Sequence, residues 1–185
     1  QIDFLGEEHL TNLKSAFIPE TRVQVYFMEH ADYFQNVPDI IYKSRNGRIF
    51  QNNHEKFLFF VHATFETLKK LFWVPDIIVC NDWQTAILPI LLKNNYVQDE
   101  RYKNIKTINF IHSINNYRKL KTDCFKKFDL NINFKSNFDI LAESMKFFDL
   151  NIVLDSKDKK NSTAIKKDKA LSSNYKKYKS KLLRY

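Results

Sequence analysis

The stretch Pro75–Thr85, PDIIVCNDWQT, decides the fold of this chain. Its apolar run Ile77–Val79 predicts a strand that is buried on both faces. The polar residues Asn81 and Asp82 follow at once, and an apolar segment with helical spacing extends over residues 86–92. A strand, a polar tip and then a helix place functional groups at the carboxyl edge of a parallel sheet, where open α/β folds bind ligands. The carboxylate and the neighbouring indole suit a polyhydroxylated ligand, because one accepts hydroxyl hydrogen bonds and the other packs on a sugar ring.

The hydrophobic pattern predicts strands and helices in alternation along the 185 residues. The predicted strands are Val23–Met28, Ile77–Cys80, Thr107–Ile111 and Asn151–Leu154, and the predicted helices are His54–Trp73, Trp83–Asn94 and Asp139–Phe148. Strands separated by helices imply right-handed crossovers. The predicted fold class is therefore α/β, a Rossmann-like doubly wound and mostly parallel sheet.

Local signals place the ends of these helices. Asn52 with Glu55 marks the start of the first helix, and Ser136 with Asp139 stands at capping-box spacing before the third. Pro89 lies inside the second helix and is expected to kink it. The composition of residues 29–52 predicts a long surface loop, with a turn at the Asn-Gly pair of residues 46 and 47. Such loops often contain ligand-binding residues.

The net charge of +9 lies entirely in the last part of the chain. Residues 1–155 carry 19 Lys and Arg against 19 Asp and Glu, whereas residues 156–185 carry 11 Lys and Arg against 2 Asp. The predicted organisation is a Rossmann-like domain over residues 1–155 and a basic, lysine-rich, helical C-terminal tail over residues 156–185. Apolar residues at spacings of three and four predict one stripe on this tail that packs on the body: Leu171, Tyr175, Tyr178, Leu182 and Tyr185.

A rival interpretation of the tail is that it binds nucleic acid or an anionic membrane surface through its charge and tyrosines. The chain is rich in Lys, Asn, Ile, Phe and Tyr, a pattern that an AT-biased genome produces without selection for basicity. The charge is therefore discounted, and nucleic acid is not expected as a partner.

Other features of the sequence narrow the class of protein to which the chain can belong. No apolar run approaches the roughly 20 residues that span a membrane and no signal peptide is recognised, so a cytoplasmic protein without a membrane partner is expected. Cys80 and Cys124 form no disulfide framework, and Cys80 is expected to be a reduced thiol in the core. His30, His54 and His62 lack metal-ligand spacing, so no metal is expected. Two glycines provide no Gly-rich phosphate cradle, so helix N-termini or another domain would hold a nucleotide.

Asp82 and His112 are candidate site residues because of their positions in the sequence. Each follows a predicted strand, so both would face one crevice at the carboxyl edge of the sheet. Alternatives remain for each residue. Asp82 could cap the following helix, His112 could be a hydrogen-bonded structural histidine, and Trp83 fits a core position as well as a ligand platform.

The run PDIIVCNDWQTAILPILLKNNY, residues 75–96, resembles the signature of the glycogen/starch synthase family. Further segments resemble other parts of that family in the same order, over about residues 15–156: VQVYFMEHADYF, HEKFLFFVHATFETLKKLFWVPD, YKNIKTINFIHSINN and FFDLNIVLDS. The resemblance implies the amino-terminal half of a GT-B fold. It also implies transfer of glucose from ADP-glucose or UDP-glucose to the non-reducing end of an α-1,4-glucan, with retention and with no cofactor besides the nucleotide-sugar donor.

The resemblance assigns roles to individual residues. Asp82 and His112 would be catalytic, close to the transferred glucose, where anionic and hydrogen-bonding groups stabilise a developing oxocarbenium ion. The residues implied in binding the nucleotide sugar and the α-glucan are Asn81, Trp83, Gln84, Ser113 and Asn115.

The chain also departs from the family's pattern. The Lys-x-Gly-Gly loop is absent, Val79 and Ser113 replace a His and an Asn, and Asn116–Arg118 replaces Tyr-Gln-Gly. The second domain with its phosphate-binding Arg/Lys pair is absent as well, so the chain is expected to be incomplete alone and to need a second chain. The alternative is a non-catalytic glucan-binding or relic domain of the same fold.

Overall fold

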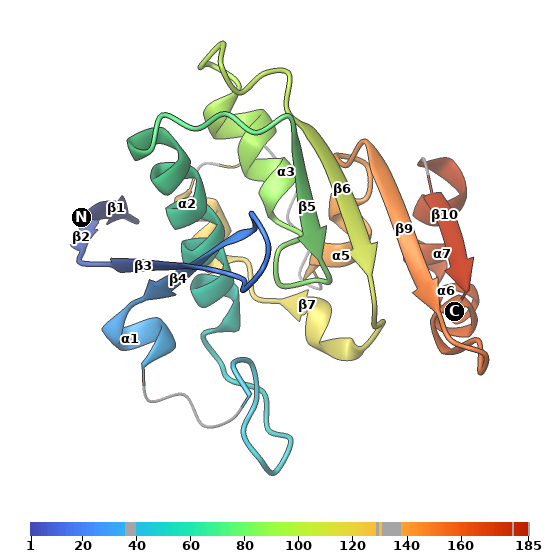
Figure 1. Ribbon diagram of the computed structural model, residues 1–185. Helices are drawn as coiled ribbons and strands as arrows, with labels where there is room; N and C mark the ends of the chain where they lie inside the picture. Colours follow the sequence, from blue (N-terminus) through green and yellow to red (C-terminus); the bar gives the residue numbers. More distant parts are fainter. Residues whose placement is uncertain (36–39, 129, 131–137, 179, 185) are drawn as a thin grey trace.

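The computed structural model describes residues 1–35, 40–128, 130, 138–178 and 180–184. A four-stranded parallel sheet with the strand order β10-β9-β6-β5 forms its centre (Figure 1). Its strands are β5 (Ile77–Asn81), β6 (Lys106–Ile111), β9 (Leu150–Asp155) and β10 (Ser180–Arg184). The predicted α/β class with a parallel sheet is confirmed, and β5, β6 and β9 lie where the sequence predicted strands.

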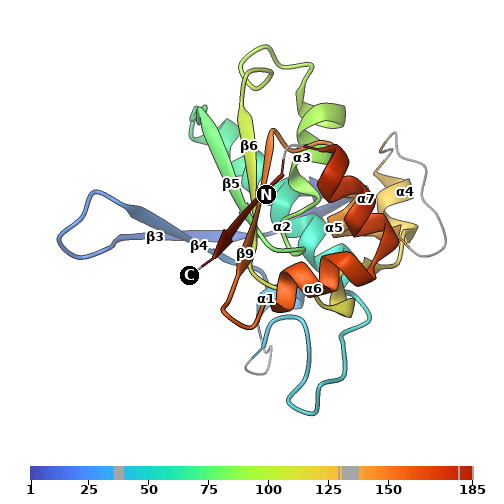
Figure 2. The same cartoon turned by 90° about the vertical axis from the view of Figure 1, so that its right-hand side faces the viewer.

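The helices gather on one face of this sheet (Figure 2). They include α2 (Asn53–Lys70), α3 (Leu88–Leu91) with its π-helical continuation (Leu92–Tyr96), α5 (Ile140–Ser144), α6 (Lys160–Lys167) and α7 (Lys169–Lys177). Alternate side chains of the strands are buried in the core, among them Cys80, Ile111 and Val153. The core therefore lies between the sheet and this helical layer.

The prediction that the β5 run is buried on both faces is wrong. Ile77 is 54% exposed and Val79 is 49% exposed, whereas Cys80 between Val79 and the strand's end is 1% exposed. β5 ends the sheet on one side, and no helix of the described residues covers its outer face in Figure 2. The apolar run indicates that this segment forms a strand, but it does not indicate how many faces of the strand are covered.

Helix α2 follows the predicted periodicity and ends earlier than predicted. Phe57, Val61 and Phe65 are buried, whereas Phe72 is 84% exposed. Phe72 takes a left-handed φ of 51°, and the N–H of Trp73 donates to the Leu68 carbonyl at 3.0 Å, which is the closing bond of a Schellman motif. At the other end of the helix, Asn52 is the N-cap residue, so the predicted start is confirmed, but its side chain makes no capping hydrogen bond.

The amino-terminal part forms two antiparallel pairs outside the central sheet. β1 (Ile2–Phe4) pairs with β2 (Glu7–His9), and β3 (Asn12–Phe17) pairs with β4 (Gln24–Glu29). The predicted strand Val23–Met28 is confirmed as β4 with a shift of one residue. Its pairing with β3 was not predicted, and the β3–β4 hairpin projects away from the body on the side opposite the helices (Figure 2).

The helix predicted over Trp83–Asn94 begins later than expected. Residues 82–87 form turns, and the helical segment runs from Leu88 to Tyr96. Pro89 therefore lies in the first turn, where its missing N–H would have no helical partner, and it does not sit in the middle of the helix. The helix predicted over Asp139–Phe148 is likewise shorter, covering only α5, with Asp139 itself as its N-cap; Ser136 lies outside the described residues.

The C-terminal segment contains two short helices and a strand in place of one basic helix. Asp168 ends α6 and caps α7, and β10 adds to the sheet next to β9. Leu171 is buried, and Tyr175, Tyr178 and Leu182 pack against the core, whereas Tyr185 lies outside the described residues. The predicted packing of the stripe on the body is therefore confirmed up to Leu182, although a strand carries its last part.

The loop of residues 40–52 contains the predicted turn. Gly47 has a φ of 84° and donates to the Ser44 carbonyl, and Lys43 pairs with Ile49 in an isolated bridge. The remaining short elements are α1 (Ala31–Phe34), a 3-10 turn (Asn116–Arg118), β7 (Lys119–Leu120), α4 (Asp123–Lys127) and β8 (Phe138–Asp139).

Candidate functional site

Asp82 lies at the carboxyl end of β5 and joins it to the end of β6. Its Oδ1 accepts hydrogen bonds from the backbone N–H groups of His112 at 2.7 Å and Ser113 at 2.9 Å. Its own N–H donates to the Phe110 carbonyl at 2.8 Å. The φ of Asp82 is 57°, a left-handed value that Asp tolerates better than most residues. The suggested role of Asp82 as a helix N-cap is wrong, because its carboxylate binds the β6 end and α3 begins only at Leu88.

His112 stands beside Asp82 at the same edge. Its Nε2 lies 2.9 Å from Oδ1 of Asn81, so Nε2 carries the proton that this amide oxygen accepts. The His112 side chain is exposed and the Asp82 side chain is half-buried. The sequence prediction that the polar ends of two strands share one edge is therefore confirmed by geometry. One Asp82 oxygen is fixed by the backbone, and Oδ2 has no hydrogen bond within the described residues.

The loop after His112 is fastened by a residue of the C-terminal segment that the sequence analysis did not single out. The Asn161 amide accepts from the Ile114 N–H at 3.1 Å and donates to the carbonyls of His112 at 2.7 Å and Leu154 at 2.6 Å. Asn161 is 8% exposed and belongs to α6. Residues beyond 155 therefore help to hold the candidate site, and the charge change that suggested a separate tail gave no signal of this role.

Trp83 does not present its ring to a ligand, which corrects the interpretation of this indole as a sugar platform. The side chain is 2% exposed and packs edge-on against Phe57 at 5.0 Å and Tyr42 at 5.8 Å between ring centroids. It anchors the turn that carries Asp82. Gln84 is half-buried, and its Oε1 is buried without a hydrogen-bond partner among the described residues.

Ser113 and Asn115 belong to the loop that continues from His112. The Asn115 Nδ2 donates to the Ser113 hydroxyl at 3.3 Å, and its Oδ1 accepts from the Tyr117 N–H at 3.0 Å, capping the 3-10 turn. The Asn115 side chain thus shapes the loop, while Ser113 contributes its N–H to Asp82. Both residues lie in the loop beside Asp82 and His112, and their contact with a substrate stays a prediction.

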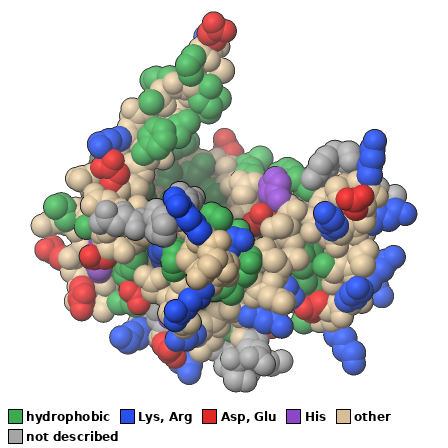
Figure 3. Space-filling view, turned by 90° about the horizontal axis from the view of Figure 1, so that it is seen from below, with side chains coloured by type: hydrophobic (Ala, Val, Ile, Leu, Met, Phe, Trp, Pro, Cys, Tyr) green, Lys and Arg blue, Asp and Glu red, His purple; other side chains and the backbone are tan. Residues whose placement is uncertain are grey.

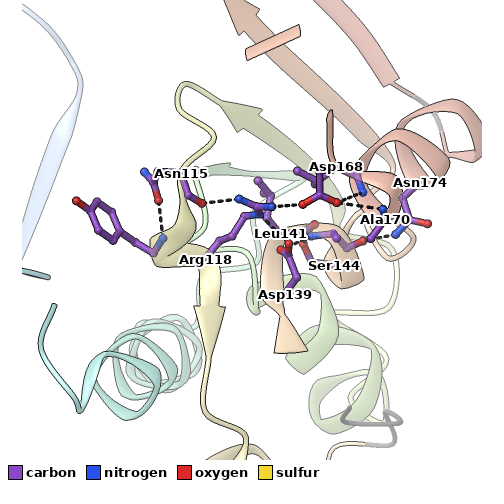
Figure 4. A network of polar contacts seen from close by, with 11 residues as sticks. Asn115, Arg118, Asp139, Leu141, Ser144, Asp168, Ala170 and Asn174 are labelled. Carbon is purple, nitrogen blue, oxygen red and sulfur yellow. Dashed lines mark hydrogen bonds and ion pairs between the residues drawn. The ribbon is translucent and has the colours of Figure 1, made fainter. Parts of the chain in front are cut away.

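A buried arginine ties this loop to two helices (Figure 4). Arg118 is 4% exposed, and its Nε donates to Asp139 at 2.7 Å, its Nη1 to the Asn115 carbonyl at 2.6 Å and its Nη2 to Asp168. Asp139 caps α5 and Asp168 caps α7, so the guanidinium links the caps of both helices. Burial raises the pKa of Asp139 although Arg118 opposes the shift. Nothing in the sequence pattern indicated this network beyond the replacement of the family's glycine by Arg118.

An open pocket of about 570 Å³ lies against the same loop. Its lining consists of the loop on one side and α6 with the start of α7 on the other: Ile114, Asn115, Asn116, Tyr117, Arg118, Ala164, Lys167 and Asp168. Because Arg118 and Asp168 neutralise each other, Lys167 supplies the net charge of the lining. A pocket of amides, one phenol and one ammonium is suited to polar, hydroxyl-rich ligands.

Two further observations concern the described residues. They contain no cluster of three or more His, Cys, Asp or Glu side chains arranged to hold a metal ion. Within the same residues, no helix has the length and apolar character needed to cross a membrane.

Comparison with known proteins agrees with this geometry. Residues 3–156 match the family model described as the starch synthase catalytic domain. The glycogen synthase of Pelodictyon phaeoclathratiforme is 34% identical over 127 residues, which are 69% of this chain and 26% of that enzyme. The glycogen synthase of Clostridium perfringens is 50% identical over 74 residues, 40% of this chain and 15% of that enzyme.

One solved structure has a similar fold. The catalytic domain of starch synthase IV from Arabidopsis thaliana, solved with ADP and acarbose, matches 97% of this chain and 38% of its own length, with a TM-score of 0.67 at 15% identity. The molecule thus has the fold of a GT-B-type α/β domain, the class to which this family belongs. More narrowly, the chain belongs to the starch synthase catalytic domain family, of glycogen and starch biosynthesis. It spans about a quarter of the length of the curated relative from Pelodictyon.

Proposed function

We propose that this chain is the acceptor-side part of a glucosyltransferase. It would act in transfer of glucose from ADP-glucose, or UDP-glucose, to the non-reducing end of an α-1,4-glucan. The observation that carries the proposal is the joined end of β5 and β6, where the Asp82 carboxylate, the His112 ring and the Asn81 amide share one edge. Family membership supports the reaction class, and the ADP and acarbose in the solved relative support an adenine nucleotide and a glucan-like ligand.

The residues present suggest how this edge would serve the reaction. Two backbone N–H groups fix the Asp82 carboxylate, so it needs little reorganisation when positive charge develops on a nearby sugar. The free oxygen of Asp82 would accept a sugar hydroxyl. The Asn81 amide orients His112 with its proton on Nε2, which leaves Nδ1 to accept a hydrogen bond from the substrate. Ser113, Asn115 and Gln84 would contribute polar contacts around it.

The proposed active site also needs residues that lie outside this chain. The chain spans 26% of the Pelodictyon enzyme, so groups that bind the donor phosphates would come from other residues of such an enzyme, on a second chain or elsewhere. The chain alone is expected to transfer little or no glucose. The proposed setting is the cytoplasm, with nucleotide sugar and α-glucan as partners and without a resident cofactor.

The test measures incorporation of labelled glucose from ADP-glucose or UDP-glucose into glycogen. The sample is a chimera in which this chain replaces the segment that it matches in the Pelodictyon glycogen synthase. Asp82→Asn and His112→Ala should each lower incorporation at least ~100-fold, the scale expected for lost transition-state stabilisation. Glu100→Gln serves as the control, because Glu100 is an exposed carboxylate whose side-chain partner is Lys103.

A second candidate function is a glucan-binding module without turnover, and the short span of the match favours it. Retention of the chain by glycogen in a native gel, combined with no incorporation by the chimera, would establish that alternative. Incorporation that survives both site substitutions would overturn the proposed roles of Asp82 and His112.

A further inference from the structure

The loop that begins at His112 is held by side chains on both of its sides. From the β5 side, the Asp82 carboxylate accepts the N–H groups of His112 and Ser113. From the opposite side, the Asn161 amide donates to the His112 carbonyl at 2.7 Å and accepts the Ile114 N–H at 3.1 Å. Two side chains therefore bind four backbone groups within three residues of the loop.

Asn161 is itself fixed to the end of β9. It stands in the first turn of α6, and its N–H donates at 3.0 Å to Oδ1 of Asp155, the fully buried last residue of the strand. Lys159 precedes α6 and provides no side-chain cap, so the Asp155 carboxylate satisfies a free N–H group of that turn. The Asn161 Nδ2 also donates to the Leu154 carbonyl at 2.6 Å. Asn161 therefore joins the carboxyl ends of β9 and β6, as Asp82 joins β5 to β6.

The other end of α6 is fastened to the same loop. Asp168 follows the helix, and its carboxylate accepts a hydrogen bond from the buried Arg118 guanidinium. Arg118 also donates to the Asn115 carbonyl of the loop at 2.6 Å. Figure 3 looks onto the carboxyl edge of the sheet, where the C-terminal elements, marked by their gathered Lys and Arg side chains, form one side of the face. A helix held at both ends has little freedom to carry the Asn161 amide away from the loop.

The position of the His112 imidazole depends on this support. The His112 side chain is exposed, so core packing does not fix it, and its Nε2 contacts the Asn81 amide oxygen at 2.9 Å. An exposed ring on a short side chain goes where its backbone carries it. Misplacement of a reacting group by about 1 Å can cost about 100-fold in rate. The groups that hold the His112 backbone therefore control the geometry that the proposed reaction needs.

We propose that Asn161 is a positioning residue for glucosyl transfer, which acts through His112 and touches no substrate. The inference rests on the proposed function and extends it, because it makes the C-terminal segment part of the site. Asn161 lies outside residues 3–156, which match the family model. Its side chain is buried and bonded to three backbone groups, so its removal should disturb the loop and not the binding of a ligand.

The activity test is a double-mutant cycle in the Pelodictyon chimera, built to carry this chain up to Tyr185. Asn161→Ala should lower kcat for glucose incorporation at least ~10-fold and change KM for nucleotide sugar and glycogen less than about two-fold. In the His112→Ala background the same substitution should change kcat less than about two-fold, because its effect passes through His112. A loss of equal size in both backgrounds would overturn the proposal.

Asn174→Ala is the matched control, since it also removes an asparagine bond from the C-terminal segment. The Asn174 Nδ2 donates to the Ala142 carbonyl at 2.6 Å and so joins α7 to α5. All assays run at a temperature where circular dichroism shows every variant folded. Asn174→Ala should then keep kcat within about two-fold of the unchanged chimera. A kcat as low as that of Asn161→Ala would attribute the loss to general destabilisation and refute the positioning role.

Hydrogen exchange in the isolated chain tests the support of the loop without any reaction. The His112 and Ser113 amides should exchange at least ~10-fold faster in Asn161→Ala than in the unchanged chain, whereas Asn174→Ala should change their exchange less than about two-fold. Equal exchange in the two variants would overturn the proposal. A chimera that transfers no glucose would refute the proposed function, since the exchange result decides separately whether Asn161 holds His112.

Discussion

The Asp82 carboxylate and the His112 backbone are joined across the carboxyl edge of the sheet, with the His112 N–H donating to Asp82 Oδ1 at 2.7 Å. The Ser113 N–H binds the same oxygen at 2.9 Å. One side chain therefore fixes the relative position of two strand ends and also the residue that carries the imidazole. Asp82 therefore has a structural role and a proposed catalytic role. Substitutions at this residue should separate its contribution to stability from its contribution to activity.

Asp82→Asn and Asp82→Ala are expected to differ in stability and to agree in activity. Asn keeps an oxygen acceptor and tolerates the left-handed φ of 57°, so the free energy of unfolding should fall by less than about 1 kcal/mol. Ala leaves two N–H groups without this acceptor and should cost about 1–3 kcal/mol. Urea unfolding of the isolated chain measures this difference. Equal stability of the two variants would show that the carboxylate is not held as described.

Arg118 should be one of the most sensitive charged residues in the chain. Arg118→Met leaves the carboxylates of Asp139 and Asp168 without their shared cation, and breaking a buried ion pair in this way costs about 3–5 kcal/mol. Arg101→Met removes an exposed pair with Asp99 and should cost less than about 1 kcal/mol. Urea denaturation of both variants tests the contrast. Similar losses for the two variants would contradict a structural role for the buried network.

The sequence could predict those elements whose hydrophobic pattern matches the secondary structure that the backbone forms. The apolar run before Asp82 and the run before His112 predicted two parallel strands, and the polar residues at their ends predicted a shared edge. Coverage of the outer β5 face was predicted wrongly, because Val79 is apolar whether or not an element of this chain covers it. The β3–β4 pairing was missed because the six residues of β3 are all exposed and show no buried alternation.

The site itself was only partly predictable for a related reason. Asp82 and His112 could be found because each follows a strand, whereas Asn161 and Asp168 act through contacts between residues far apart in sequence. A cap at Asp168 also breaks the tail into two helices, although apolar spacing alone continues through it. Trp83 stands next to Asp82 in sequence, yet the turn sends its ring into the core.

Stability should fall as the pH drops below neutrality, and His62 should contribute to this fall. Burial lowers the pKa of His62, and the neutral ring is matched by its surroundings: Nε2 lies 2.8 Å from the Asp3 carbonyl and the Tyr96 hydroxyl lies 2.8 Å from Nδ1. A folded-state pKa below the unfolded value means that the unfolded chain binds more protons. The contribution is therefore present above about pH 6.5 and is lost as the pH falls through the lower folded pKa.

The His62→Gln variant tests this contribution, because Gln can keep a hydrogen bond but does not titrate. Unfolding free energies at pH 5 and pH 7 should differ less in the variant than in the parent chain. Burial also lowers the pKa of His30 and His54, so part of the slope should remain. An unchanged slope in His62→Gln would show that this ring does not titrate differently in the two states.

Cys80 should be inert to thiol reagents in the folded protein. It is 1% exposed, and burial raises the pKa of its thiol to about 12, so the reactive thiolate is scarce at pH 8. A Cys124→Ser variant isolates Cys80 as the remaining cysteine. That variant should release no chromophore from a disulfide reagent at pH 8 until urea unfolds it, and then one equivalent. Rapid reaction without urea would mean that the end of β5 opens easily, and it would place the Asp82 turn among the least stable parts of the fold.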